Sequence, residues 1–180
     1  MILSVDAEEK ARKMSEAKQL QNIDSVYCSN SVRAIQTAKY IAYKNGNMEV
    51  NVENALNERC FGVKYIKELP CDYIKRQYDD FDYKLENEES INEVKERITR
   101  FIDENILVKN FSKVAVVLHG VNLTAYLTNF CKVSFLNDQF KILFNNDLVY
   151  DGILKLPDIF ELEFDYNNKI QSVKNIKIGE

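Results

Sequence analysis

Residues 113–131 read KVAVVLHGVNLTAYLTNFC and join a strand pattern to a helix pattern. The first part, 113–120, is apolar without alternation, which is typical of a parallel strand covered on both faces. His119 ends this strand, and 121–131 follows as a helix. In an open α/β sheet, ligands bind beyond the carboxyl ends of the strands. The stretch therefore predicts a site at the only histidine of the chain.

Strand and helix patterns alternate through the rest of the sequence until a final hairpin. The expected elements are a helix from Val5 capped by Ser4, a strand at 23–29, a helix at 31–46, an edge strand at 48–56, an amphipathic helix at 89–106, and a hairpin at 157–178 with Asn167 and Asn168 near its turn. This order predicts an α/β fold in three layers, with a mostly parallel sheet flanked by helices.

The chain has the size of one domain, and we expect a single domain over residues 1–180. Residues 63–87 hold a proline and several Tyr and Asp residues between predicted elements. We interpret them as an insertion near the pocket that contains short helices. Its cations, such as Lys64 and Arg76, are expected on a solvated face rather than on a ligand.

Composition narrows the function classes. The net charge of −4 argues against a nucleic-acid binder, and the chain has no apolar run of membrane-spanning length. The N-terminus lacks the pattern of a signal peptide, and the four cysteines are scattered. With one histidine, a zinc site is not expected, and we predict no metal and no cofactor. Reduced thiols fit a cytoplasmic protein.

Reactive residues follow three predicted strands. Ser29 and Arg33 come after the first strand, Glu58 and Arg59 after the edge strand, and His119 after the third. Arginine matches phosphate oxygens with two parallel hydrogen bonds, and helix N-termini add backbone donors. A carboxylic acid in such a pocket can protonate a leaving oxygen. We expect phosphate or a small phosphorylated molecule as the ligand, bound by Arg33, Ser29 and Arg59.

The sequence resembles the histidine phosphatase superfamily, which includes phosphoglycerate mutases. IDSVYCSNSVRAIQTAKYIA (23–42) resembles the family pattern I-x-x-[VI]-Y-x-S-x-x-x-R-A-x-Q-T-A. LNERCFG (56–62) resembles L-x-E-x-x-[FY]-G, and EESINEVKERITRF (88–101) resembles G-E-S-x-x-x-[VF]-x-x-R. The final hairpin and the first helix resemble their family counterparts as well.

The resemblance implies roles for individual residues. Arg33 corresponds to a phosphate-pocket arginine, with Ser29 lining the same pocket. Glu58 corresponds to the acidic proton donor. His119 corresponds to the second pocket histidine, which stabilises the transferring phosphoryl group. The implied activity is hydrolysis or transfer of a phosphomonoester, with Glu58 and His119 as catalytic residues and no cofactor.

The sequence also departs from the family pattern. The family's first strand ends in R-H-G, whose histidine becomes phosphorylated, and no RHG occurs here. Cys60 stands where mutases carry histidine, and Thr124 stands where many members carry arginine. Without the RHG strand, the strand at 113–118 and the one near 159–164 must pair directly or leave an open edge. We expect the chain to close this gap or to form a homodimer through it.

Three hypotheses account for the departure. The sequence is a truncated histidine phosphatase with impaired activity, or it is an inactive domain that binds phospholigands or proteins. In the third hypothesis Cys28 is the nucleophile, because a thiolate at a helix N-terminus has a lowered pKa. The spacing C-x4-R from Cys28 to Arg33, with no glycine between them, argues against this third hypothesis.

Overall fold

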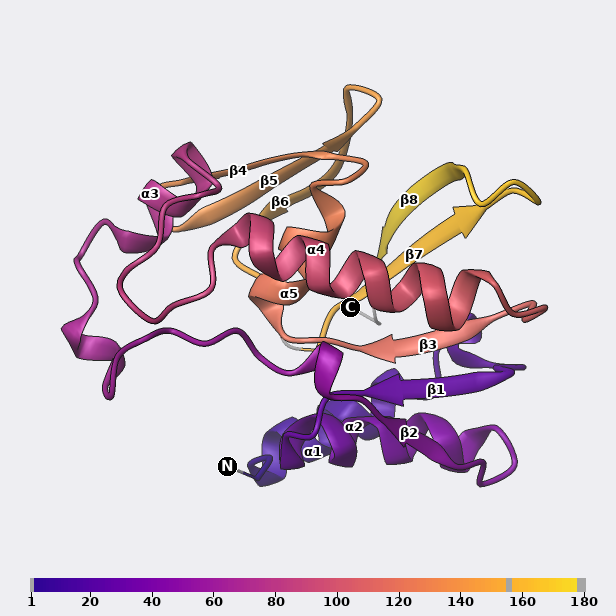
Figure 1. Ribbon diagram of the computed structural model, residues 1–180. Helices are drawn as coiled ribbons and strands as arrows, with labels where there is room; N and C mark the ends of the chain where they lie inside the picture. The colour runs from indigo at the N-terminus through magenta and orange to yellow at the C-terminus, as the bar shows by residue number, and fades with distance from the viewer. Residues whose placement is uncertain (1, 155–156, 178–180) are drawn as a thin grey trace.

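The computed structural model describes residues 2–154 and 157–177, and a small parallel sheet lies at its centre (Figure 1). Its strands are β1 (Ser25–Cys28), β2 (Val50–Val52) and β3 (Val114–Val117). Their order is β2-β1-β3, and both pairings are parallel. The predicted parallel strands are confirmed, with β2 at the edge as expected.

Helices lie on both faces of this sheet (Figure 1). They are α1 (Val5–Met14) and α2 (Val32–Lys44) on one face, and α4 (Ile91–Ile102) and α5 (Gly120–Leu127) on the other. A further helix, α3 (Tyr73–Asp79), lies away from this sheet. Short 3₁₀ helices occur at Lys18–Leu20, Asn54–Leu56 and Ile66–Glu68. A π-helical turn at Asp103–Leu107 follows α4. Serine side chains begin three of the helices: Ser4, Ser31 and Ser90 each accept a hydrogen bond from the backbone three residues on. The three-layer α/β fold is thereby confirmed.

The alternation of side chains along β1 explains the layers. Val26 and Cys28 point to one face and pack with residues of α1 and α2, among them Met14 and Ala38. Tyr27 points to the other face and packs against α4, where its ring meets Phe101 at 5.7 Å between centroids. Since successive strand residues face opposite ways, a strand buried on both faces must be apolar throughout.

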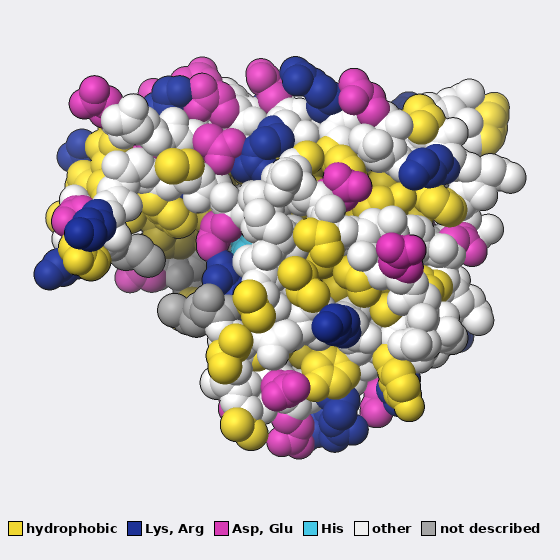
Figure 2. Space-filling view, turned by 60° about the horizontal axis from the view of Figure 1, so that its bottom comes forward, with side chains coloured by type: hydrophobic (Ala, Val, Ile, Leu, Met, Phe, Trp, Pro, Cys, Tyr) yellow, Lys and Arg dark blue, Asp and Glu magenta, His cyan; other side chains and the backbone are white. Residues whose placement is uncertain are grey.

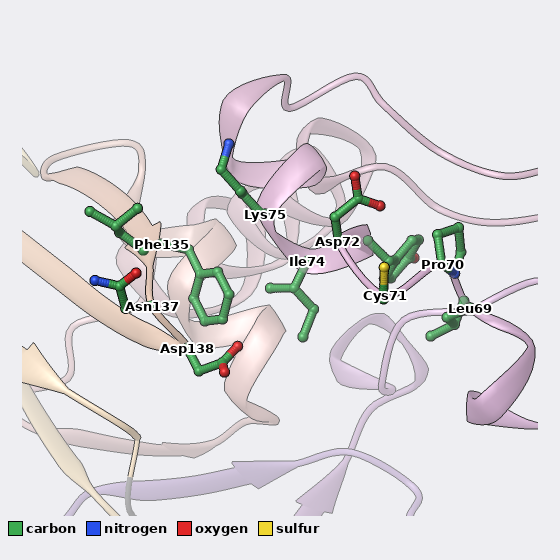
Figure 3. Close-up of a pocket in the computed structure, with 11 residues that line it drawn as sticks. Leu69, Pro70, Cys71, Asp72, Ile74, Lys75, Phe135, Asn137 and Asp138 are labelled. Carbon is green, nitrogen blue, oxygen red and sulfur yellow. The ribbon is translucent and has the colours of Figure 1, made fainter.

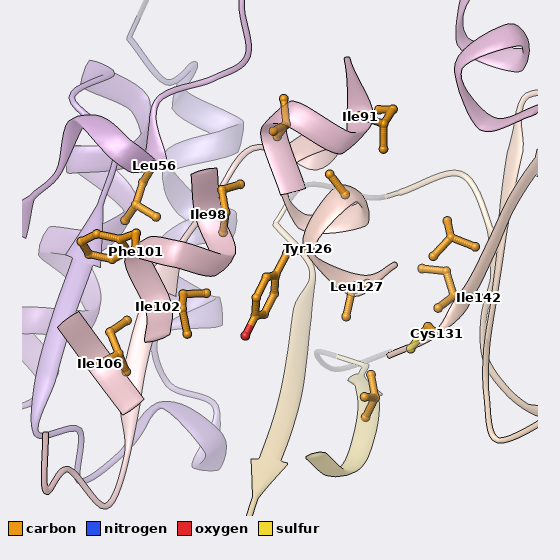
Figure 4. Close-up of a cluster of buried hydrophobic side chains, with 14 of the residues drawn as sticks. Leu56, Ile91, Ile98, Phe101, Ile102, Ile106, Tyr126, Leu127, Cys131 and Ile142 are labelled. Atoms are coloured by element: carbon orange, nitrogen blue, oxygen red, sulfur yellow. The ribbon is translucent and has the colours of Figure 1, made fainter. Parts of the chain in front are cut away.

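The larger of the two cores lies between α4, α5 and the strands around them (Figure 4). Ile91, Val94 and Ile98 are fully buried at helical spacing on α4. Leu127 of α5 and Ile142 belong to the same core and are also fully buried. The amphipathic pattern of 89–106 thus predicted the packed face of α4 correctly.

An antiparallel sheet that we did not predict lies at residues 132–152. It consists of β4 (Lys132–Leu136), β5 (Gln139–Phe144) and β6 (Asp147–Gly152) in sequential order. Two-residue turns join the strands, and all four turn residues have positive φ: Asn137, Asp138, Asn145 and Asn146. Asn and Asp tolerate this backbone region, so each pair suits a tight hairpin. The sequence carries this turn signal at Asn137-Asp138 and Asn145-Asn146.

The predicted C-terminal hairpin is confirmed as β7 (Ile159–Phe164) and β8 (Ile170–Ile176). Asp165 organises its turn, because its carboxylate accepts hydrogen bonds from the backbone of Asn167 and Lys169. Within the described residues, β7 pairs only with β8, and β3 pairs only with β1. β3 and β7, which we expected either to pair directly or to leave an open edge, are therefore not paired with each other.

The 63–87 segment forms α3 and its flanking loops beside the tip of the β4–β5 hairpin (Figure 3). A cavity of about 390 Å³ lies between them, lined by residues 69–75 and 135–138. Its lining holds none of the five predicted site residues. Among residues 2–154 and 157–177, no helix combines the length and the apolar character needed to cross a bilayer.

Candidate active site

The carboxyl ends of β1 and β3 lie side by side, and both lead directly into helices. Cys28 and Val117 are register partners, so the residues that follow them share one edge of the sheet. Ser31 caps α2 and places Arg33 in the first helical turn. His119 is the N-cap residue of α5, although its side chain makes no capping hydrogen bond and is free for other contacts. The topology therefore brings Ser29, Arg33 and His119 to one edge.

His119 is nearly buried and contacts two of the predicted residues. Its Nε2 lies 2.8 Å from the Ser29 hydroxyl, and its Nδ1 lies 3.2 Å from Arg33 Nη2. A guanidinium has no acceptor, so Arg33 must donate to Nδ1. Nε2 then carries the proton and donates to Ser29 Oγ. The network thus fits a neutral imidazole with a defined tautomer.

The surroundings of His119 favour the neutral form. Burial lowers the pKa of His119 below its ordinary value of 6.5; the Glu58 carboxylate opposes this shift, and the Arg33 guanidinium adds to it. A bound phosphate would reverse part of this balance, because an anion favours the imidazolium.

Glu58 completes the cluster. Its Oε2 forms an ion pair with Arg33 Nη2 and lies 4.0 Å from His119 Nδ1. The side chains of Arg33 and Glu58 are 35% and 42% exposed, so a ligand can reach both without unfolding the loop. Figure 2 shows the imidazole as a small cyan area between carboxylate and cation side chains, in a hollow of the surface. Four of the five predicted site residues thus meet.

Arg59 is placed elsewhere, against our expectation that it helps to bind phosphate with Arg33. Its side chain is 1% exposed and lies near Glu88, with 3.7 Å between Nη2 and Oε1. Nη2 also donates to the Tyr73 hydroxyl at 2.9 Å, and the guanidinium stacks on Phe61. Among the described residues, Arg59 makes no hydrogen bond or ion pair with Ser29, Arg33, Glu58 or His119.

The two positions that depart from the family pattern have ordinary local roles. The Thr124 hydroxyl is buried and bonds to that of Tyr78. Cys60 is exposed, and its thiol donates to the carbonyl of Asn87.

Cys28 does not fit the role of a nucleophile. Its side chain is fully buried in the core between the sheet and α2. Burial raises the pKa of the Cys28 thiol to about 11, which is the opposite of what an attacking thiolate requires. Burial and the raised pKa both count against the hypothesis of a Cys28 nucleophile.

Asparagines that we did not predict connect the loops of the site. The backbone N–H of Asn30 donates to the side chain of Asn57, and the Asn30 amide donates to Asn54. Asn122 of α5 donates to the carbonyls of Leu56 and Asn57. Asparagine carries both donor and acceptor groups, and such links depend on tertiary contacts that no sequence pattern marks.

Within the described part of the chain, no cluster of His, Cys, Asp and Glu side chains is suited to hold a metal.

Several solved structures with a similar fold are phosphatases by name, at 15–20% sequence identity to this chain. The mycobacterial glucosyl-3-phosphoglycerate phosphatase in complex with inorganic phosphate superposes with a TM-score of 0.63 at 15% identity, covering 97% of this chain and 86% of that one. A phosphoserine phosphatase from Entamoeba histolytica, in complex with 3-phosphoglyceric acid, gives 0.56 at 19% identity and covers 86% and 85%. These likenesses establish the fold.

A putative α-ribazole-5'-P phosphatase from Escherichia coli K-12 gives a TM-score of 0.54 at 20% identity, covering 86% of this chain and 83% of that one. Among curated proteins, none matches the sequence. The model of the histidine phosphatase superfamily (branch 1) matches residues 1–147, which include the whole of the Ser29, Arg33, Glu58 and His119 cluster. This protein belongs to the histidine phosphatase superfamily.

Proposed function

We propose that this protein binds small phosphomonoesters at Ser29, Arg33, Glu58 and His119, and that its phosphoryl-transfer activity is impaired. The observation that carries the proposal is the meeting of Arg33, Glu58 and His119 where two helices begin. Structural neighbours that bind inorganic phosphate and 3-phosphoglyceric acid support it.

Each member of the cluster has a role in this proposal. Arg33 leaves Glu58 and binds two phosphate oxygens with its planar fork. The first backbone N–H groups of α2 and α5 have no partner within their helices and add donors for the anion. His119 donates a hydrogen bond to the phosphoryl group. In hydrolysis, water attacks the phosphorus, the P–O bond to the alcohol breaks, and a protonated Glu58 gives its proton to the leaving alcohol oxygen.

The impairment follows from the number of histidines. The family resemblance implies one histidine as nucleophile and a second that stabilises the phosphoryl group. The sequence contains one histidine, and it corresponds to the second. Loss of a nucleophile costs on the order of 10⁶ in rate where it has been measured in a catalytic triad.

The same count favours a second candidate function, a phospholigand-binding domain without turnover. Four free thiols fit a cytoplasmic location for either function. A small phosphorylated molecule is the proposed partner, and nucleic acid is not expected, given the net charge of −4.

Binding and hydrolysis measurements on the purified protein test the proposal. Inorganic phosphate, added in a calorimetric titration and in thermal unfolding, is expected to bind and to raise the melting temperature, and Arg33→Gln is expected to abolish both effects. Hydrolysis of p-nitrophenyl phosphate is expected to be slow and lost in His119→Asn. Binding without hydrolysis supports the second candidate instead. The absence of both binding and hydrolysis contradicts both functions.

A further inference from the structure

The loop that carries Glu58 has no strand pairing, so contacts from other elements must fix it. Arg97 of α4 supplies two of them. Its Nη1 donates to the carbonyl of Ala55 at 2.6 Å and to that of Asn57 at 3.1 Å. These carbonyls lie just before Glu58 in the chain, so Arg97 holds the N-terminal side of the loop.

Glu89 holds the other side of the same loop. One of its carboxylate oxygens accepts a hydrogen bond from the backbone N–H of Cys60 at 3.0 Å. Its own backbone N–H donates to the carbonyl of Cys60 at 3.1 Å. Cys60 lies two residues after Glu58, so the backbone is held on both sides of the acidic residue.

Arg97 and Glu89 also bind each other. Nε and Nη2 of Arg97 donate to the two oxygens of Glu89, at 2.8 and 2.9 Å. This paired geometry is the strongest contact that an arginine makes with a carboxylate, and a lysine cannot reproduce it. The two side chains are about a quarter exposed. They act as one unit with fixed geometry.

The Glu89–Arg97 pair belongs to α4 and the residue before its N-cap, and this helix is fixed by its cap and by the core. Ser90 and Glu93 form a capping box at the start of α4, directly after Glu89. Ile91, Val94 and Ile98 of the same helix are fully buried in the core and hold it in place. A displacement of the Glu58 loop would therefore have to break hydrogen bonds to a rigid element.

We propose that Glu89 and Arg97 are positioning residues for Glu58, which hold its loop so that the carboxylate reaches Arg33 and His119. Neither residue makes a described hydrogen bond or ion pair with the cluster itself. The inference rests on the proposed function for the role of Glu58 as acid. The geometry it concerns exists without any substrate.

The titration of His119 tests this inference. His119 is the only histidine, so its imidazole signals in NMR are unambiguous. The Glu58 charge raises the pKa of His119, and Glu58→Gln is expected to lower it. Arg97→Gln is expected to lower it in the same direction, because the carboxylate moves away. In a double variant with Glu58→Gln, Arg97→Gln is expected to add little.

Matched variants separate positioning from general effects. Arg100→Gln removes the same charge from an exposed site on the same helix and is expected to leave the titration unchanged. Arg97→Lys keeps the charge without the fork and is expected to behave like Arg97→Gln. The single and double variants form a double-mutant cycle. If the Arg97→Gln variant does not fold, the isosteric Glu89→Gln replaces it in this cycle.

An equal shift with and without Glu58 would overturn the inference, as would an unchanged titration in the Arg97 or Glu89 variants. The measurement needs no phosphate. A failure to bind phosphate would therefore count against the proposed function alone, and an additive cycle would count against the positioning role alone.

Discussion

The proposed function makes Glu58 and a phosphate ligand competitors for Arg33. The two side chains form an ion pair, and both are partly exposed. A phosphate that takes the guanidinium must first displace the carboxylate. The proposed function therefore implies two states of the cluster: in one, Arg33 pairs with Glu58, and in the other, Arg33 binds the ligand. The free energy of the ion pair opposes the change to the second state.

Glu58→Gln is accordingly expected to strengthen the binding of inorganic phosphate. A partly exposed ion pair contributes about 0–1 kcal/mol, so the gain in affinity should reach at most about fivefold. Titration calorimetry at fixed ionic strength measures it. Glu49→Gln removes the same charge just before β2, at the opposite end of the sheet, and should leave the affinity unchanged. Weaker binding by Glu58→Gln would contradict the competition.

His119 makes the stability of the fold depend on pH. Its pKa in the folded protein lies below the ordinary value of 6.5, because burial disfavours the charged form. Below about pH 6.5 the unfolded chain therefore takes up a proton that the folded chain does not, and stability falls with decreasing pH. Denaturant unfolding at pH 7.5 and at pH 5.5 measures this. The loss is expected to be smaller in His119→Asn, and an equal loss would argue against a buried neutral imidazole.

At the scale of elements, α4 both packs in the core and contacts the loop that carries Glu58. One face carries the buried Ile91, Val94 and Ile98, and another carries Arg97 toward the Glu58 loop. The helical period brings both sets of residues onto one rigid element. A change in the packing of α4 should therefore affect the stability of the whole domain.

Ile98→Ala tests the packing of α4. The side chain is fully buried in the larger core, so its truncation is expected to lower the free energy of unfolding by about 2–5 kcal/mol. Glu96→Ala, at an exposed position of the same helix, should change it by less than about 0.5 kcal/mol. Chemical denaturation of both variants provides the comparison, and similar effects of the two would contradict the observed burial.

Elements differed in how readily their sequences could be interpreted. The apolar run of β3 and the capped pattern of α4 each determine one structure locally, because burial and capping act over a few residues. Strands β4 to β6 were missed because their signal lies in Asn137-Asp138 and Asn145-Asn146, not in a regular apolar pattern. A prediction based on apolar patterns without these turn residues therefore lacks the whole antiparallel sheet.

At the scale of the molecule, we propose that residues 1–180 form one domain. The larger core supports this, since it contains Tyr27 of β1, Ile142 of β5 and Val173 of β8. The rings of Tyr150 and Phe160 also join β6 to β7, with 5.7 Å between centroids. The antiparallel strands are thus packed onto the body that carries the site.

The unpaired edges of β3 and β7 lead to a prediction about assembly. Within the described residues neither strand has a partner beyond β1 and β8 respectively, and a free strand edge attracts another chain. We expect a homodimer through this edge. Light scattering coupled to size exclusion, over roughly a hundredfold range of concentration, should give the mass of two chains. A monomer at all concentrations would contradict the prediction.

The sequence by itself determined the alternation of strands and helices and placed Ser29, Arg33 and His119 after strands that end at the same edge. These features depend on local periodicity, capping and burial, which short segments encode. Only the tertiary structure decided that Glu58 pairs with Arg33, 25 residues away, and that Arg33 reaches His119 across 86 residues. It also turned Arg59 into the interior and set Arg97 behind the Glu58 loop. Such contacts form only when separate elements pack, so no local pattern encodes them.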